Sequence, residues 1–169
     1  LIRSHGRKTT GNYFSSVQTP KYIELGYNWR MSTIISALAL SQLNKIEKLI
    51  KLRRANAERY NKKLKKLKEI KTHSEPENYK HVYQLFSIQL PSKKIRDGLM
   101  RFLAGRGIMT KVFFDPIHVT RHFSKYTSKQ QNLPITRMIS ERILSLPMYP
   151  GIPKRELDYV VNFFKKISN

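Results

Sequence analysis

The longest regular pattern in the sequence is an apolar stripe with helical spacing in the first half of the chain. Ser32 is a suitable N-cap, since its hydroxyl can accept a hydrogen bond from the first turn. Apolar residues then recur every three or four positions, so we predict one long helix, straight or bent, over residues 32–70. At about 1.5 Å per residue this helix exceeds about 50 Å, so we expect it to join two domains or bend between them. The stripe consists of Leu43, Ile46, Leu49, Ile50, Ala57, Tyr60, Leu64 and Leu67.

Shorter patterns follow a polar turn at residues 74–78. Apolar positions alternate over 81–90 until Pro91, which predicts a strand. A helix is expected over 92–105, and a second strand of the same sheet is expected over 108–114.

The remaining patterns predict helices and turns. We expect a short helix near 121–125, a helix over 136–144, a turn over 146–151 and a last helix that begins after Pro153. Residues 1–30 show no sustained period and are expected to form loops with short extended pieces. The fold class is therefore α+β, with a small C-terminal domain over 71–169.

The composition is typical of a folded domain and excludes several kinds of functional site. The chain has 169 residues, 40% of them hydrophobic, and no cysteine. Disulfides, zinc fingers, iron–sulfur clusters and thiol nucleophiles are therefore excluded, and a reducing cytoplasm is the expected location. No apolar run approaches the ~20 residues of a membrane span. The N-terminus lacks an initiator Met and an apolar signal core, so we expect a fragment of a longer protein.

The charge balance is strongly basic, with 33 Lys and Arg against 11 Asp and Glu and a net charge of +22. Such a surface attracts nucleic acid, anionic lipid or phosphorylated small molecules. The densest run, 45–71, alternates Lys and Arg with Leu and Ile, which is typical of the solvated face of a helix. A nucleic-acid-binding module stays an alternative on charge alone, although no helix-turn-helix, ribonucleoprotein or zinc motif supports it.

Motifs for catalysis are scarce. His118 and His122 stand four residues apart near Asp115, but Pro116 and Thr120 argue against a regular helix there, so we expect no metal site. No phosphate-binding glycine loop, nucleophile elbow or pair of carboxylates stands out. The residues alone therefore predict no self-sufficient active site.

Two short segments group apolar anchors with polar side chains, as loops that line ligand sites do. The first is 27–31, where Asn28 stands between Tyr27 and Trp29 and Arg30 follows, and the second is 113–118, with Phe113, Phe114 and His118. The alternatives are structural: Asn28 turns the backbone, Arg30 pairs with a surface acid, and His118 faces water.

Several ordered motifs resemble the DegT/DnrJ/EryC1/StrS family of sugar aminotransferases, which depend on pyridoxal phosphate. They are "RSHGR" at 3–7, the segment 24–64 that begins "ELGYNWRM", "GIMTKVFFDPIH" at 107–118 and "ILSLPMYPGIPKRELDYVV" at 143–161. The resemblance covers essentially the whole chain.

The resemblance implies the C-terminal portion of a fold-type I aminotransferase. Residues 1–31 would be a remnant of the large α/β cofactor-binding domain, 32–70 the long connecting helix and 71–169 the small domain. The family's Schiff-base lysine lies upstream of the "RSHGR" segment, and no lysine of this chain stands in its motif. The parent protein is therefore expected to be the enzyme and this chain alone to be inactive.

The resemblance also assigns roles to the two segments. Family members are homodimers with shared active sites, in which an Asn at the position of Asn28 binds the partner's cofactor phosphate. Arg30 would add positive potential, and Trp29 replaces the usual Tyr. His118, Phe113 and Phe114 would lie near the sugar nucleotide. The implied reaction is amination of a keto nucleotide sugar for surface polysaccharide or glycoconjugate synthesis, with glutamate the expected donor. The sugar, the carbon aminated, and the choice between transaminase and dehydratase stay open.

Overall fold

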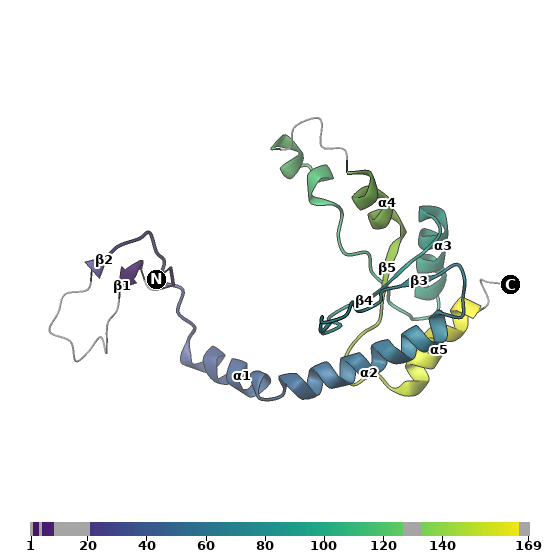
Figure 1. Ribbon diagram of the computed structural model, residues 1–169, viewed down its shortest axis with the longest axis horizontal. Coiled ribbons are helices and arrows are strands. Elements are labelled where there is room, and N and C mark those ends of the chain that lie inside the picture. The colour runs from purple at the N-terminus through teal and green to yellow at the C-terminus, as the bar shows by residue number, and fades with distance from the viewer. Residues whose placement is uncertain (1, 4, 9–20, 127–132, 166–169) are drawn as a thin grey trace. The chain divides into compact units, whose positions relative to one another are not determined.

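The chain forms two units joined within its helical first half. The computed structural model describes residues 2–3, 5–8, 21–126 and 133–165 (Figure 1). Contacts divide the chain into Leu1–Ile46 and Glu47–Asn169, and each unit is described by itself. No described helix combines the length and the apolar character that crossing a bilayer requires.

The first unit contains a small hairpin and one helix. Strands β1 (Arg7–Lys8) and β2 (Lys21–Tyr22) pair antiparallel, with Arg7 opposite Tyr22. Helix α1 (Thr33–Leu43) begins at the predicted N-cap, where the Ser32 hydroxyl accepts a hydrogen bond from the Ile35 amide at 3.4 Å. None of the residues of α1 is buried.

The single helix predicted over 32–70 is wrong in its continuity and in its end. Helix α1 ends at Leu43, and α2 (Ile46–Leu64) begins after a turn in which the Lys45 amide donates to Gln42 O at 3.0 Å. After Leu64 the chain tightens into turns, and Leu67 and Ile70 pack against the core. In a continued helix Leu67 would share the buried face of Tyr60 and Leu64, whereas Ile70 would leave it, so the turns after Leu64 allow Ile70 to reach the core.

The second unit is built on a three-stranded antiparallel sheet in the order β3 (Lys71–Thr72), β4 (Phe86–Gln89) and β5 (Ile143–Leu146). Lys71 lies opposite Gln89, and Ser87 lies opposite Ser145. The hydroxyl oxygens of Ser87 and Ser145 are 2.7 Å apart, so this polar pair is satisfied within the sheet.

The strand predicted over 108–114 is reduced to a bridge, and β5 takes its place in the sheet. Only Lys111 pairs, and its partner is Ser145 of β5. The helix predicted over 136–144 is α4 (Pro134–Arg142), which ends where β5 begins. The run Ile-Leu-Ser-Leu is short and apolar, a pattern that periodicity cannot assign, and pairing with β4 decides it.

The helices predicted over 92–105 and after Pro153 are confirmed. Helix α3 (Lys93–Ala104) is capped by the Ser92 hydroxyl, and α5 (Lys154–Lys165) follows Pro153. Between α3 and α4 lie two short 3-10 helices, η1 (Ile117–Val119) and η2 (Phe123–Lys125), the second within the predicted 121–125.

The core of the second unit lies where α2, α3 and α5 meet the sheet. It buries apolar side chains from each of these elements, and the aromatic ring of Tyr60 stacks on that of Phe86 at 4.8 Å between centroids. The fully buried large side chains are Tyr60, Leu64, Ile88, Leu103, Leu144, Leu157, Val161 and Phe164. Burial of these side chains from segments far apart in the chain stabilises the unit.

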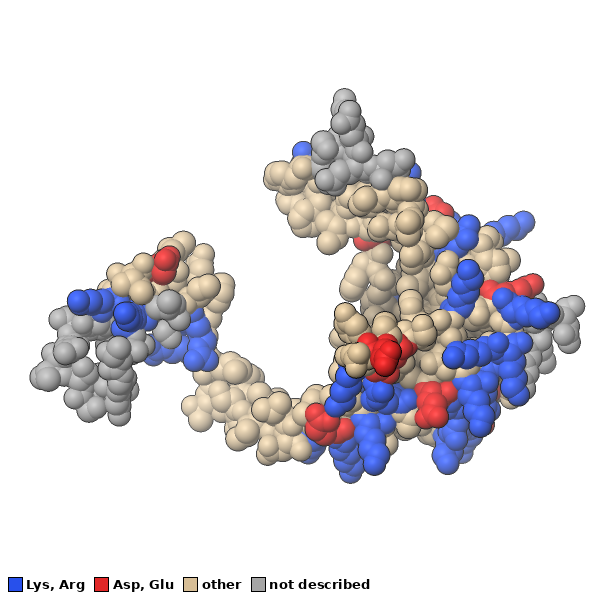
Figure 2. Space-filling model, in the orientation of Figure 1, with Lys and Arg blue, Asp and Glu red and all other residues tan. Residues whose placement is uncertain are grey.

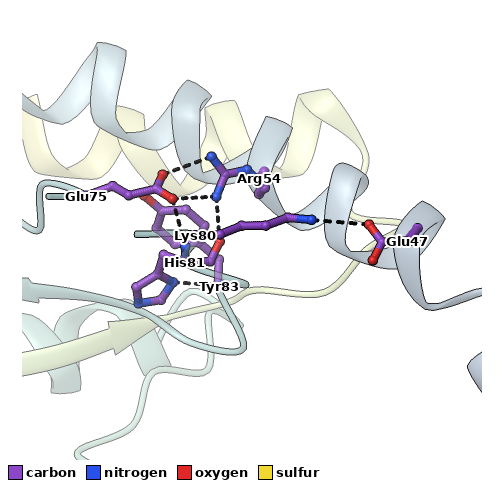
Figure 3. Close-up of polar contacts among 6 residues, drawn as sticks. All are labelled: Glu47, Arg54, Glu75, Lys80, His81 and Tyr83. Atoms are coloured by element: carbon purple, nitrogen blue, oxygen red, sulfur yellow. Dashed lines mark hydrogen bonds and ion pairs between the residues drawn. The ribbon is translucent and has the colours of Figure 1, made fainter. Parts of the chain in front are cut away.

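Two arginines of α2 explain why β4 is shorter than the predicted strand 81–90. Arg53 donates to the carbonyl oxygens of Tyr83 and Gln84 at 3.2 and 2.9 Å. Arg54 donates to the carbonyl of His81 at 2.7 Å and to both carboxylate oxygens of Glu75, as Figure 3 shows. These carbonyls are therefore bonded to helix side chains and do not form a strand ladder.

Candidate functional site

The segment before α1 is positioned by two glycines in close contact. A Cβ atom on Gly26 would lie 1.9 Å from the backbone nitrogen of Gly6, and one on Gly6 would lie 1.6 Å from Glu24 O. Gly6 also has φ +69°, a left-handed conformation that favours glycine. Backbone bonds connect the two segments, including Tyr27 N to Ile2 O at 2.7 Å and Trp29 N to Arg3 O at 3.2 Å.

This pairing gives the predicted Asn28–Arg30 segment an extended course. The rings of Tyr27 and Trp29 stack almost parallel, with centroids 4.4 Å apart and planes 5° apart. Successive side chains of an extended chain point to opposite sides, so Asn28 projects away from the aromatic pair. Asn28 and Arg30 are both exposed.

The hydrogen-bonding groups of Asn28 and Arg30 are exposed and available to a ligand. Neither side chain forms an ion pair or a hydrogen bond with another residue in the described part of the chain. The described residues therefore do not show the structural alternative, in which Arg30 pairs with a surface acid. An amide and a guanidinium together offer several donors and no competing acidic group, which suits a phosphate or carboxylate ligand.

The second predicted segment, 113–118, follows the Lys111 bridge to the sheet. Phe113 and Phe114 meet edge to face with ring centroids 5.4 Å apart, and Phe114 is 79% exposed. His118 lies in η1, which Pro116 precedes and the Thr120 hydroxyl closes by donating to Ile117 O at 2.8 Å. The Nε2 atom of His118 is shielded from solvent and has no hydrogen-bond partner in the described structure.

The two histidines considered for a metal do not share a helix. His118 belongs to η1, whereas His122 precedes η2 and packs its ring against Phe123 and Tyr126. The residues that the structure describes contain no group of three or more His, Cys, Asp or Glu side chains arranged to hold a metal ion. The i,i+4 spacing therefore does not correspond to one helical face here.

The structure brings together the members of each predicted group but gives no relation between the groups. Asn28 and Arg30 are adjacent in the first unit, and Phe113, Phe114 and His118 lie along one loop of the second. Gly6 and Gly26 were not predicted to shape the site. The sequence does contain a signal, the glycine in "RSHGR" and the one in "LGYN". These glycines indicate a close backbone approach only when the two segments are considered as a pair.

A comparison with protein families matches residues 1–165 to the DegT/DnrJ/EryC1/StrS aminotransferase family. Two curated relatives are GDP-perosamine synthases. The one from Vibrio cholerae is 32% identical over 86% of this chain and 40% of its own length, and the one from Escherichia coli O157:H7 is 30% identical over 80% and 36%. The chain thus spans about two fifths of the length of these relatives.

Solved structures agree with this match. A DegT DnrJ EryC1 StrS aminotransferase from Brucella abortus is 27% identical, with a TM-score of 0.81 over 99% of this chain and 42% of that one. The aminotransferase PseC of Helicobacter pylori shares the fold, with a TM-score of 0.80 over 98% of this chain and 44% of that one at 23% identity. A family match over nearly the whole chain favours an enzyme over the nucleic-acid-binding alternative. The chain belongs to the DegT/DnrJ/EryC1/StrS aminotransferase family.

Proposed function

We propose that this chain is the C-terminal part of a cytoplasmic, pyridoxal phosphate-dependent aminotransferase that acts on a keto nucleotide sugar, with glutamate as the amino donor. The cofactor, when bound, supplies an electron sink for amino-group transfer. The residues of this chain would bind and orient the ligands, while the Schiff-base lysine would come from the part of the protein that precedes the "RSHGR" motif.

The observation that carries this proposal is the open pair of donors at Asn28 and Arg30. Both side chains are exposed and lack described partners, and the segment that holds them is fixed by the contact of Gly6 with Gly26. A side-chain amide donates two hydrogens and a guanidinium five, so together they fit the oxygens of a phosphate. In this assignment Asn28 binds the cofactor phosphate and Arg30 adds positive potential.

The 113–118 segment would contribute to substrate binding. Phe113 and Phe114 offer exposed aromatic faces, and His118 has a ring nitrogen that is shielded from solvent and has no described partner. Aromatic walls with a few polar groups are typical of small-molecule sites. The relatives named GDP-perosamine synthase support a sugar attached to a nucleoside diphosphate, made for a surface polysaccharide or glycoconjugate.

The proposed assembly is a homodimer in which Asn28 serves the site of the partner subunit. Asn28→Ala in the full-length protein is expected to weaken cofactor retention and to leave the fold intact. Loss of one charge-assisted hydrogen bond costs ~1.5–3 kcal/mol, or roughly 10- to 150-fold in affinity.

Mixed dimers test the cross-subunit role, with Asn28→Ala and removal of the Schiff-base lysine placed in two arrangements. With the changes on separate subunits, the only lysine-bearing site receives a normal asparagine and should retain cofactor like wild type. With both changes on one subunit, the surviving lysine faces the altered position and should retain cofactor poorly. Equal retention in the two arrangements would show that Asn28 is not a ligand of the partner's cofactor.

A further inference from the structure

One face of α2 contains a basic groove that the proposed aminotransferase site does not use. The groove has a volume of about 530 Å³ and is lined by Ala55, Glu58, Arg59, Lys62, Lys63 and Lys66. We call this set the α2 groove. Figure 2 shows Lys and Arg side chains gathered over this helix and its neighbours, with few Asp and Glu among them.

Three of the four cations of the α2 groove share one helical face. Positions 59, 62 and 63 follow the i, i+3, i+4 spacing, which places their side chains next to one another over about 6 Å of the helix axis. Lys66 follows in the turn after Leu64 and lines the same groove. The short side chain of Ala55 leaves space at one end of this row, so the cations border a hollow.

The groove keeps a net positive charge, because its four cations outnumber the two acids near them, Glu58 and Asp158. Arg59, Lys62 and Lys66 form no ion pair or side-chain hydrogen bond within the described part of the chain. Lys63 pairs with Asp158 of α5 at 2.6 Å, and Glu58 is the one acid among the lining residues that the structure describes. Four like charges within eight residues repel one another, and a bound anion would relieve that repulsion.

The opposite face of α2 packs into the core and so fixes the position of the groove. Ala57, Tyr60 and Leu64 are fully buried, and the Tyr60 hydroxyl donates to Pro147 O at 3.0 Å. Asn56 donates to Tyr149 O, also at 3.0 Å. The cations therefore project from a fixed helix, which lowers the conformational cost of holding a ligand.

We propose that the α2 groove binds a small molecule that carries a diphosphate group. Its volume lies in the range of small-molecule sites, roughly 300–1,000 Å³. Two adjacent phosphates match a row of four cations better than a single anion does, because each phosphate can accept from two donors. A membrane or a nucleic acid would use the whole basic surface of α2 equally and needs no hollow. This inference is independent of the aminotransferase proposal.

Calorimetric titration of the chain with inorganic pyrophosphate at low salt tests the inference. We expect saturable binding of one pyrophosphate per chain. The variant Arg59→Gln/Lys62→Gln/Lys66→Gln should bind at least about 10-fold more weakly, since three charge-assisted contacts are lost. The matched control is Lys48→Gln/Lys51→Gln/Lys65→Gln, which removes the same charge from exposed positions outside the groove lining and should bind within about twofold of wild type.

Removal of a negative charge from the groove lining distinguishes a specific binding site from a general effect of surface charge. Glu58→Gln removes the acid from the lining and should tighten pyrophosphate binding, by about two- to fivefold. Glu77→Gln removes the same charge from an exposed residue beyond α2 and should leave binding unchanged. Circular dichroism of every variant checks that the helices persist.

Three outcomes overturn the inference. The first is no saturable pyrophosphate binding, and the second is an equal loss in the groove variant and its control. The third is binding confined to vesicles rich in phosphatidylglycerol or to RNA, which would assign the surface to a membrane or a nucleic acid.

Discussion

Arg54 and Glu75 form a two-bond ion pair between α2 and the segment that precedes β4, with distances of 2.8 and 2.9 Å. Glu75 also accepts from the His81 amide at 2.7 Å, and the Tyr83 amide donates to His81 Nδ1 at 2.8 Å (Figure 3). A further pair, Lys80 with Glu47 at 3.3 Å, connects the same segment to the first turn of α2. This network fixes the 75–83 segment to the helix.

Acid should weaken this network. The hydrogen bond from Arg54, and then that from the His81 amide, hold the pKa of Glu75 below its ordinary value. A carboxyl whose pKa is lowered in the folded state stabilises that state above its unfolded pKa, about 4.3, and the stabilisation is lost as the pH falls through the lower folded value. We expect the free energy of unfolding, measured by urea titration, to fall over that acid range.

The variant Glu75→Gln should lower the free energy of unfolding at neutral pH and should remove much of this acid dependence. Glu77→Gln, an exposed change two residues away, is the control and should keep wild-type behaviour. Identical acid titrations for Glu75→Gln and wild type would mean that the ion pair contributes nothing to stability.

The buried hydroxyl of Tyr60 should contribute to the free energy of unfolding at neutral pH and should make it depend on pH in alkaline solution. It donates to Pro147 O, and burial raises its pKa. Tyr60→Phe keeps the ring stacked on Phe86 but leaves the carbonyl unsatisfied, which should cost about 1–2 kcal/mol of unfolding free energy. Tyr126→Phe, at a residue 76% exposed, should change stability by less than about 0.5 kcal/mol.

The sign of the alkaline effect follows from the raised pKa. The folded state keeps the Tyr60 proton more firmly than the unfolded state does, so stability from this group is complete below about pH 10 and declines above it. Urea unfolding at increasing pH should show that decline in wild type and a smaller one in Tyr60→Phe. A decline of the same size in both proteins would exclude Tyr60 as its source.

Two glycine substitutions should have opposite effects. Gly98 lies within α3, and a Cβ added there would meet no atom within 4 Å, so Gly98→Ala should raise stability by about 0.5–1 kcal/mol. Gly26→Ala would place its Cβ 1.9 Å from Gly6 N and should separate the two paired segments. Hydrogen exchange of the Tyr27 amide, which is bonded to Ile2 O, should then accelerate. Unchanged protection of that amide would count against the close contact.

The isolated 169-residue chain should form no stoichiometric adduct with pyridoxal phosphate. The proposed function assigns the Schiff-base lysine to the part of the protein that precedes "RSHGR", so borohydride trapping followed by peptide mapping should give only scattered, unsaturable labelling of surface lysines. The full-length protein should trap one lysine outside these 169 residues. Saturable labelling of a single lysine within this chain would contradict the proposed division of the site.

The sequence by itself determined the local features of this protein. Ser32 and Ser92 cap helices as predicted, because a hydroxyl and the amides it accepts from lie within one turn of the chain. The apolar spacing of α3 and α5 was sufficient to place both helices, and the ordered motifs were sufficient to indicate the family. The segment with Asn28 and Arg30 also stands out from its residue types alone, since it groups polar side chains with aromatic residues, as ligand-lining loops do.

Only the tertiary structure decided the features that depend on distant partners. Ile143–Leu146 is a strand because β4 and Lys111 pair with it, and the turns after Leu64 are where Leu67 and Ile70 pack against the core. The strand predicted from 81 begins only at Phe86, since Arg53 and Arg54 take the carbonyls before it. The contact of Gly6 with Gly26 likewise joins residues twenty positions apart. Such pairings depend on which surfaces meet after folding, and the spacing of residues along the chain does not predict them.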